Sequence, residues 1–240
     1  MEIIVKPRKS MLIGLVIASV LIWPSGEALP QQKSDTPGII AIGDSLTAGI
    51  FHDGSGKYIC TARGNLILTR KEQASCIGGG SPDIGGWVSM LALKKGVTVF
   101  NHGVAGDTTT SVLARLNAAI AASPATHVVV ITGTNDVISG NLDKAIINIR
   151  QMVVQIQEAG KIALVGTLPP LSGSRFSDHE ADIQTINSEI IKLRTELPSL
   201  RVVHIHEALK PNWNKYTSGD FIHLGLHGNK IIADLLSQAI

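Results

Sequence analysis

Five short apolar runs rich in β-branched residues recur along the chain, and segments with helical spacing separate them. The runs lie at residues 38–42, 97–100, 127–132, 162–167 and 201–205. They are continuous rather than alternating, which is typical of strands covered on both faces, as in parallel sheets. Helical spacing predicts helices at 111–122, 141–160, 181–197 and 230–240. This alternation predicts an α/β fold, a three-layer α/β/α sandwich around a five-stranded, mostly parallel sheet.

Polar segments follow three of the predicted strands. In doubly wound folds ligands bind beyond the carboxyl ends of the strands, so chemistry is expected there. The segments are GDSL (43–46), NHGVAGDTT (101–109) and GTND (133–136).

The first 28 residues have the pattern of a secretory signal peptide. Basic residues precede the apolar run at 11–23, and small residues lead to a predicted cleavage after Ala28. The run is short for a bilayer crossing, which needs about 20 residues. We therefore expect a secreted or periplasmic protein without stable membrane insertion, with a polar linker at 29–37 and a domain at 38–240. An uncleaved amino-terminal anchor is the alternative.

Residues 51–86 interrupt the alternation of strands and helices. This Gly-rich insertion holds the only two cysteines, Cys60 and Cys76, and an even count in an oxidising compartment favours a disulfide between them. Its GSGK sequence is not a phosphate loop, because Phe51 stands at the first glycine position and Tyr58 follows the lysine.

Ser45 is a candidate nucleophile, and His223 is its candidate base. Asp220 lies three residues before His223, a spacing at which a carboxylate reaches the imidazole N–H and fixes its tautomer. Taken singly, each residue has a plainer interpretation. Asp44 or Ser45 is also expected to cap a helix, and an Asp/His pair is common surface polarity.

Donors for an oxyanion are available in the same segments. The backbone N–H groups of Ser45 and Gly103 and the side chain of Asn135 would together stabilise a tetrahedral intermediate. Turn chemistry is the plainer explanation of Gly103 and Asn135.

Taken together, these segments resemble the SGNH, or GDSL, hydrolase family. Ser45 in GDSL, Gly103 in NHGVAGDTT, Asn135 in GTND and His223 in DFIHL occur in the family's order, and the resemblance extends from residue 38 to the carboxyl terminus. It implies a flavodoxin-like SGNH hydrolase fold. It also implies Ser45 as nucleophile, His223 as base with Asp220 as its acid, and an oxyanion hole of Ser45, Gly103 and Asn135.

Two departures from the family pattern stand out. Phe221 and Leu224 occupy positions where the last block often has Gly and Pro, which alters the expected turn. The insertion after GDSLTAG is longer than in compact members, so their substrate preferences do not transfer.

The expected function is that of an exported serine esterase, either lysophospholipase- or thioesterase-like or acting on short acyl chains. A carbohydrate O-acetylesterase is the alternative, followed by a non-catalytic module that binds a glycan or lipid. Neither a metal nor an organic cofactor is implied. The net charge of +2 indicates no nucleic-acid partner, and the sequence does not indicate an oligomeric state.

Other chemistries find weaker support. The α/β-hydrolase pattern G-x-S-x-G and the zinc pattern HExxH do not occur. A zinc site would use His204 and His206, expected on one face of a strand, with His223, His227 and Asp220. His102 and His179 are interpreted as loop polarity.

Overall fold

A computed structural model describes residues 38–52, 58–60, 86–173, 176–217 and 219–240. The predicted signal peptide and linker lie outside the described residues, as do most of the 51–86 insertion and the predicted Cys60–Cys76 disulfide. Within and beside the insertion, strands β2 (Ile50–His52) and β3 (Tyr58–Cys60) pair antiparallel.

The central sheet has the strand order β4-β1-β5-β6-β7, and every neighbouring pair is parallel. This order defines the flavodoxin-like type of doubly wound sheet, so the predicted fold class is confirmed. The strands are β1 (Gly38–Gly43), β4 (Val99–Gly103), β5 (Ala125–Ile131), β6 (Ile162–Gly166) and β7 (Arg201–Val203).

The sheet is buried on both faces, as the continuous apolar runs indicate. In β1, Ile40 and Ile42 pack into one core cluster, whereas Ile39 and Ala41 pack into the other. Successive side chains of a strand point to opposite faces, so one apolar run supplies both cores.

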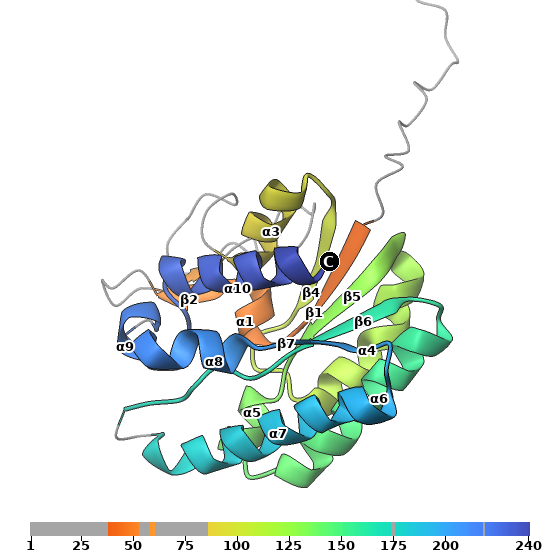
Figure 1. The fold of residues 1–240 in the computed structure, drawn as a ribbon. Coiled ribbons are helices and arrows are strands. Elements are labelled where there is room, and N and C mark those ends of the chain that lie inside the picture. Colours follow the sequence, from red (N-terminus) through yellow and green to blue (C-terminus); the bar gives the residue numbers. More distant parts are fainter. Residues whose placement is uncertain (1–37, 53–57, 61–85, 174–175, 218) are drawn as a thin grey trace, which may run out of the picture. The chain divides into compact units, whose positions relative to one another are not determined.

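Within the part of the chain that the structure describes, three helices cover each face of the sheet (Figure 1). On one face lie α4 (Thr109–Ala122), α6 (Leu142–Glu158) and α7 (Glu180–Glu196). On the other lie α3 (Trp87–Lys95), α8 (Ile205–Leu209) and α10 (Leu226–Ala239). Three further short helices are α1 (Ser45–Ala48), α5 (Thr134–Ile138) and α9 (Trp213–Tyr216). None of the described helices has the length and apolar character needed to cross a membrane.

Two strands differ from the sequence-based expectation in ways that bear on the site. The second strand was expected at 97–100 but runs from Val99 to Gly103, so it includes the start of the polar segment. The last strand ends at Val203, because Ile205 already begins α8 and is fully buried. The expectation that His204 and His206 share a strand face is therefore wrong.

Candidate active site

Ser45 lies at the first position of α1, directly after the carboxyl end of β1. The preceding residue, Asp44, caps this helix: its Oδ1 accepts a hydrogen bond of 3.0 Å from the Leu46 N–H. A side-chain oxygen at the cap position satisfies an otherwise unpaired amide. Because Asp44 performs the capping, the hydroxyl of Ser45 is left for another contact.

That contact is with His223. Ser45 Oγ lies 2.9 Å from His223 Nε2, and His223 Nδ1 lies 2.5 Å from Asp220 Oδ2. A carboxylate accepts from the protonated ring nitrogen, so Nδ1 carries the hydrogen and Nε2 presents its lone pair to the serine hydroxyl. The side chains of His223 and Asp220 are only 14% and 17% exposed, which shields both groups from competing water.

The turn at 220–223 holds this pair in place. Asp220 Oδ1 accepts hydrogen bonds from the backbone N–H groups of Ile222 (3.0 Å) and His223 (2.9 Å). Phe221, at the family's glycine position, has a φ of 61°. Glycine adopts this conformation freely, whereas an L-residue bears a cost of about 1–3 kcal/mol. The turn therefore keeps the backbone shape that a glycine would favour.

Gly103 has a different role from the predicted one. Its N–H donates to Asn101 Oδ1 at 2.9 Å, so this amide is not directed at a substrate. A Cβ on Gly103 would lie 2.1 Å from Ala48 N, and one on Gly43 would lie 2.0 Å from Ile131 O. The absence of a side chain at Gly103 thus allows its backbone to pack closely against α1. Its assignment to the oxyanion hole is not met in this structure.

Asn135 lies at the predicted place, after β5 and within α5. Its Nδ2 donates one hydrogen to the Asp107 carbonyl at 2.8 Å, which leaves the second hydrogen for another acceptor. Asp107 ends a turn closed by its own N–H on Val104 O at 3.2 Å. Within this turn Gly106 is exposed and has a φ of 79°. Gly106 therefore offers an amide in an open loop that Asn135 holds.

Arg115 ties these segments together, although the sequence analysis did not single it out. Its guanidinium donates to Gly43 O (2.8 Å), to His102 O (2.5 Å) and to Asp107 Oδ2 (2.8 Å). One planar group thus joins the ends of β1 and β4 to the loop that Asn135 contacts. Arg115 is the only charged residue of α4, a signal in the sequence that could have identified it.

A buried polar network fixes the GDTT and GTND segments to each other. Asp136 accepts from Thr109 N–H and from Thr109 Oγ1, both at 2.8 Å, and Asn148 Nδ2 donates to Thr109 Oγ1 at 2.9 Å. Asp136 is 1% exposed. A fully hydrogen-bonded network of this kind rigidifies its surroundings, so the loops beside Ser45 are well supported.

Burial raises the pKa of Asp44 to about 7, and the nearby carboxylates Asp136 and Asp107 add to the rise. The Leu46 N–H and His223 oppose it. Asp44 is 1% exposed, and its Oδ2 has no hydrogen-bond partner among the described residues. A buried carboxyl group without a full set of partners favours its neutral form.

Asp44→Asn is expected to remove a pH dependence of stability. The raised pKa means that Asp44 contributes most to stability below about pH 4, where it is neutral in both folded and unfolded chains. This contribution is lost as the pH rises to about 7, because only the unfolded chain ionises readily. The free energy of unfolding of the variant relative to wild type should therefore rise over this range by up to about 4 kcal/mol. Urea unfolding at successive pH values measures it, and a pH-independent difference would contradict the expectation.

Four of the other histidines in the described residues have partners outside this triad. His204 Nδ1 lies 3.7 Å from Glu207 Oε2, whereas the buried His206 lies 3.5 Å from Glu180 Oε1. His102 contacts Ser123 Oγ at 3.0 Å, and His179 lies 3.9 Å from Asp182. No group of three or more His, Cys, Asp or Glu residues in the described part of the chain has the arrangement of a metal site.

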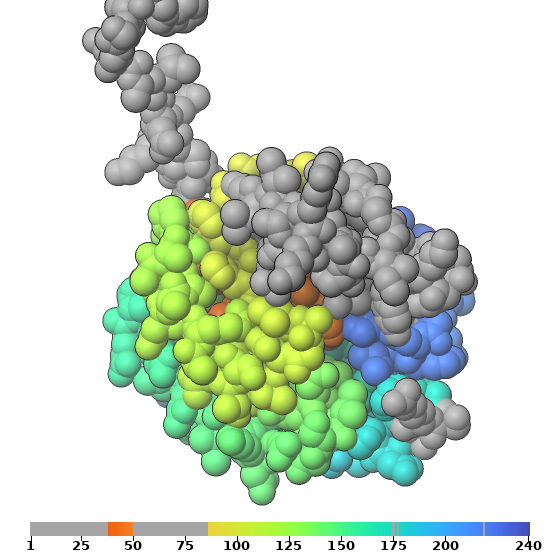
Figure 2. All heavy atoms as spheres, turned by 180° about the vertical axis from the view of Figure 1, so that it is seen from behind, coloured from red at the N-terminus to blue at the C-terminus, as the bar shows by residue number. Residues whose placement is uncertain are grey.

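Figure 2 shows the described segments at the molecular surface, from the side opposite to Figure 1. Atoms of the orange segment that contains β1, α1 and β2 emerge between the yellow-green segment after β4 and the blue segments near the carboxyl terminus. Chain ends far apart in the sequence thus meet on one face.

Comparisons with known proteins agree with this architecture. Residues 41–231 match the model of the GDSL-like lipase/acylhydrolase family. An acetylxylan esterase from Geobacillus stearothermophilus superposes with a TM-score of 0.63 at 19% identity, over 85% of this chain and 93% of that one. A G-D-S-L family lipolytic protein from Veillonella parvula superposes with a TM-score of 0.62 at 14% identity. The match covers 85% of this chain and 97% of that one.

A lipase/acylhydrolase from Enterococcus faecalis gives a TM-score of 0.59 at 19% identity, over 85% of this chain and 94% of that one. No curated protein matches the chain. The structural similarities support the assignment of the fold, and the family match covers most of the chain. The chain therefore belongs to the GDSL-like lipase/acylhydrolase family.

Proposed function

We propose that the protein is an exported serine esterase that hydrolyses carboxylic esters through an acyl-serine intermediate. The observation that carries this proposal is the continuous hydrogen-bonded series Ser45 Oγ, His223 Nε2, His223 Nδ1 and Asp220 Oδ2. A nucleophile, a base and a group that orients the base are the three parts that acyl transfer needs. Export rests on the amino-terminal sequence pattern alone.

Acylation begins when Ser45 Oγ attacks the ester carbonyl carbon and its proton passes to His223 Nε2. The tetrahedral intermediate then collapses, and the departing alcohol takes the proton from Nε2. Water next attacks the acyl-serine, with His223 again accepting a proton. The carboxylic acid leaves, and Ser45 regains its hydrogen. Asp220 stabilises the imidazolium that forms in both halves of the reaction.

The negative charge of the tetrahedral oxygen needs donors beside Ser45. We assign this role to the Ser45 N–H, the second hydrogen of Asn135 Nδ2 and the Gly106 N–H. Gly106 replaces Gly103 in this assignment because the Gly103 amide is occupied by Asn101. Pre-positioned donors of this kind commonly contribute a factor of about 100 to 1,000 each in rate.

A p-nitrophenyl ester series from acetate to palmitate, with a fluorophosphonate probe, tests this function. We expect hydrolysis of at least one ester, and phosphonylation with loss of fluoride at Ser45, located by peptide mass. The chain-length optimum separates a short-chain esterase from a lysophospholipase-like enzyme. A carbohydrate O-acetylesterase, the alternative supported by similarity to the acetylxylan esterase, would prefer acetate. Hydrolysis with the probe attached elsewhere would overturn the assignment.

Arg115→Lys is expected to lower kcat by about 10- to 100-fold with little change in KM. A lysine lacks the planar fork with which the guanidinium contacts all three acceptors, so we expect the loops that bear Gly106 and Asn135 to lose their alignment with Ser45. Steady-state kinetics on the best ester measures the effect. Arg201→Lys is the matched control, because the exposed Arg201 guanidinium donates to the Ala239 carbonyl of α10. Equal activity of both variants would show that the Arg115 contacts are dispensable.

A further inference from the structure

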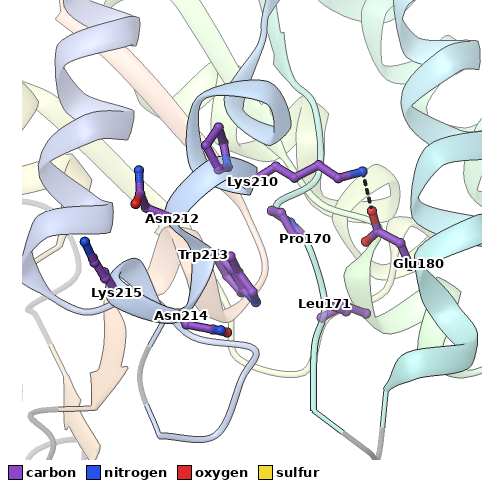
Figure 3. Close-up of a pocket in the computed structure, with 9 residues that line it drawn as sticks. Pro170, Leu171, Glu180, Lys210, Asn212, Trp213, Asn214 and Lys215 are labelled. Atoms are coloured by element: carbon purple, nitrogen blue, oxygen red, sulfur yellow. Dashed lines mark hydrogen bonds and ion pairs between the residues drawn. The ribbon is translucent and has the colours of Figure 1, made fainter.

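A pocket of about 430 Å³ lies between the segment that follows β6 and the segment that joins α8 to α9. Its volume falls within the range of small-molecule sites, roughly 300–1,000 Å³. Its lining includes Leu171, Glu180, Lys210, Trp213, Asn214 and Lys215. Figure 3 shows the indole nitrogen of Trp213 pointing away from its own helix, toward the side where Leu171 and Asn214 lie.

The lining offers hydrogen-bond groups that the described residues do not satisfy. Trp213 is 5% exposed, yet its Nε1 has no hydrogen-bond partner among the described residues. The same holds for Glu180 Oε2. Buried polar atoms normally have partners, so two unpaired atoms in the lining of one cavity indicate a polar ligand. Lys210 is engaged with Glu180 at 3.0 Å, whereas Asn214 and Lys215 stand exposed at the rim.

This pocket adjoins the segment that carries His223. The helix that bears Trp213 is bonded to that segment: Gly225 N–H donates to Tyr216 O at 2.8 Å, and Thr217 Oγ1 donates to His223 O at 3.2 Å. Two residues beyond Leu171 of the opposite wall, a Cβ at Gly173 would lie 3.0 Å from the ring of Phe221. Phe221 follows Asp220 directly and is 41% exposed. Both walls of the pocket therefore lead to the Asp220–His223 turn.

The polar groups of the lining indicate which portion of an ester, the acyl group or the alcohol, would bind in the pocket. A long acyl chain would desolvate the ammonium and amide groups of the rim without pairing them, which is costly. A hydroxyl-bearing ring can accept from the Trp213 N–H and from Asn214 and Lys215, and can donate to Glu180. The pocket thus suits the alcohol portion of a substrate better than its acyl portion.

We propose that this pocket binds a sugar ring, the alcohol portion of the natural ester, and so makes the enzyme selective for acylated glycans. The inference rests on the proposed function. The ring contacts are the same before and during attack by Ser45, so they lower KM without changing kcat.

Two acetates that differ only in the alcohol test this assignment. They are p-nitrophenyl acetate and methyl 2-O-acetyl-β-D-xylopyranoside, each assayed with Trp213→Phe, Asn214→Ala and Lys215→Ala. Each variant should raise KM for the sugar acetate about 3- to 10-fold, the value of one hydrogen bond, and leave p-nitrophenyl acetate kinetics within two-fold. Trp87→Phe, at another buried indole with an unpartnered Nε1, and Lys144→Ala, an exposed lysine of α6, are the controls.

The outcomes separate the two proposals. Unchanged kinetics on the sugar acetate in all three variants, or equal losses on both acetates, would overturn the pocket assignment while the esterase function stands. A KM effect found instead on lysophosphatidylcholine would also overturn it, in favour of a lipid headgroup. Absence of hydrolysis of either acetate by the wild type, with no probe at Ser45, would mean that the proposed function itself fails. Asn214 and Lys215 are exposed, so the Asn214→Ala and Lys215→Ala variants still test the pocket assignment if Trp213→Phe folds poorly.

Discussion

Ser45→Ala is expected to lower kcat for p-nitrophenyl esters by about 10⁵-fold or more, to near the level of hydrolysis in buffer. The substitution removes the hydroxyl oxygen that lies 2.9 Å from His223 Nε2. Without it no acyl-enzyme can form, and the donors that remain can assist only the direct attack of water. The size of this loss follows from the combined action of nucleophile and base, since either is of little use alone.

The variant should fold normally, which makes the result simple to interpret. Asp44, not Ser45, supplies the side-chain cap of α1, so alanine leaves the helix start intact. Thermal unfolding within about 2 °C of wild type is therefore expected. Ser188→Ala is a matched control on α7, where the exposed hydroxyl donates only to Gln184 O. Retention of a tenth or more of the wild-type activity by Ser45→Ala would refute the serine mechanism.

Asp220→Asn should lower kcat by about 10³- to 10⁴-fold with KM nearly unchanged. The amide oxygen can still accept from the Ile222 and His223 N–H groups, so the turn is preserved. The amide nitrogen, however, would face His223 Nδ1 as a donor. This forces the hydrogen onto Nε2, which then cannot accept the proton of Ser45.

A pH profile and a control variant make this second prediction specific. The pH dependence of kcat should change with the variant, because the base is now held in the wrong tautomer, whereas a purely structural loss would lower activity alike at every pH. Asp234→Asn is the control, since that carboxylate pairs with Lys94 and Lys230 at the surface. Full activity of Asp220→Asn would show that His223 needs no carboxylate partner.

The sheet could be predicted from the sequence because its signal is local. Runs such as HVVVIT (127–132) are too apolar and too β-branched for an exposed element, and each lies between helical segments. Helix α3 was missed because it follows the Gly-rich insertion. Its buried residues Trp87, Val88 and Leu91 are nevertheless spaced as on a helix face, and Gly96 ends it with a φ of 64°.

The sequence predicted only those site residues that belong to the ordered motifs. Asp220 and His223 are near neighbours in the chain, and the family resemblance supplied Ser45. The hydrogen bond from the Gly103 N–H to Asn101 Oδ1 could not be predicted from the sequence. Both residues are common in turns, and neither indicates that this amide has an acceptor within the chain. The three-way contact of Arg115 depends on where two strands and a loop end in space, which no local pattern specifies.

The contact between Ser45 and His223 joins residues 178 positions apart in the sequence, one near the start of the described fold and the other next to its last helix. A chain that emerges from the ribosome amino terminus first carries its nucleophile for most of its synthesis without a base. Hydrolytic competence must then arise abruptly, when the final segment docks on a sheet that is already formed. Loss of the segment from His223 onward would remove the base, whereas the sheet and the nucleophile on α1 would remain in the chain.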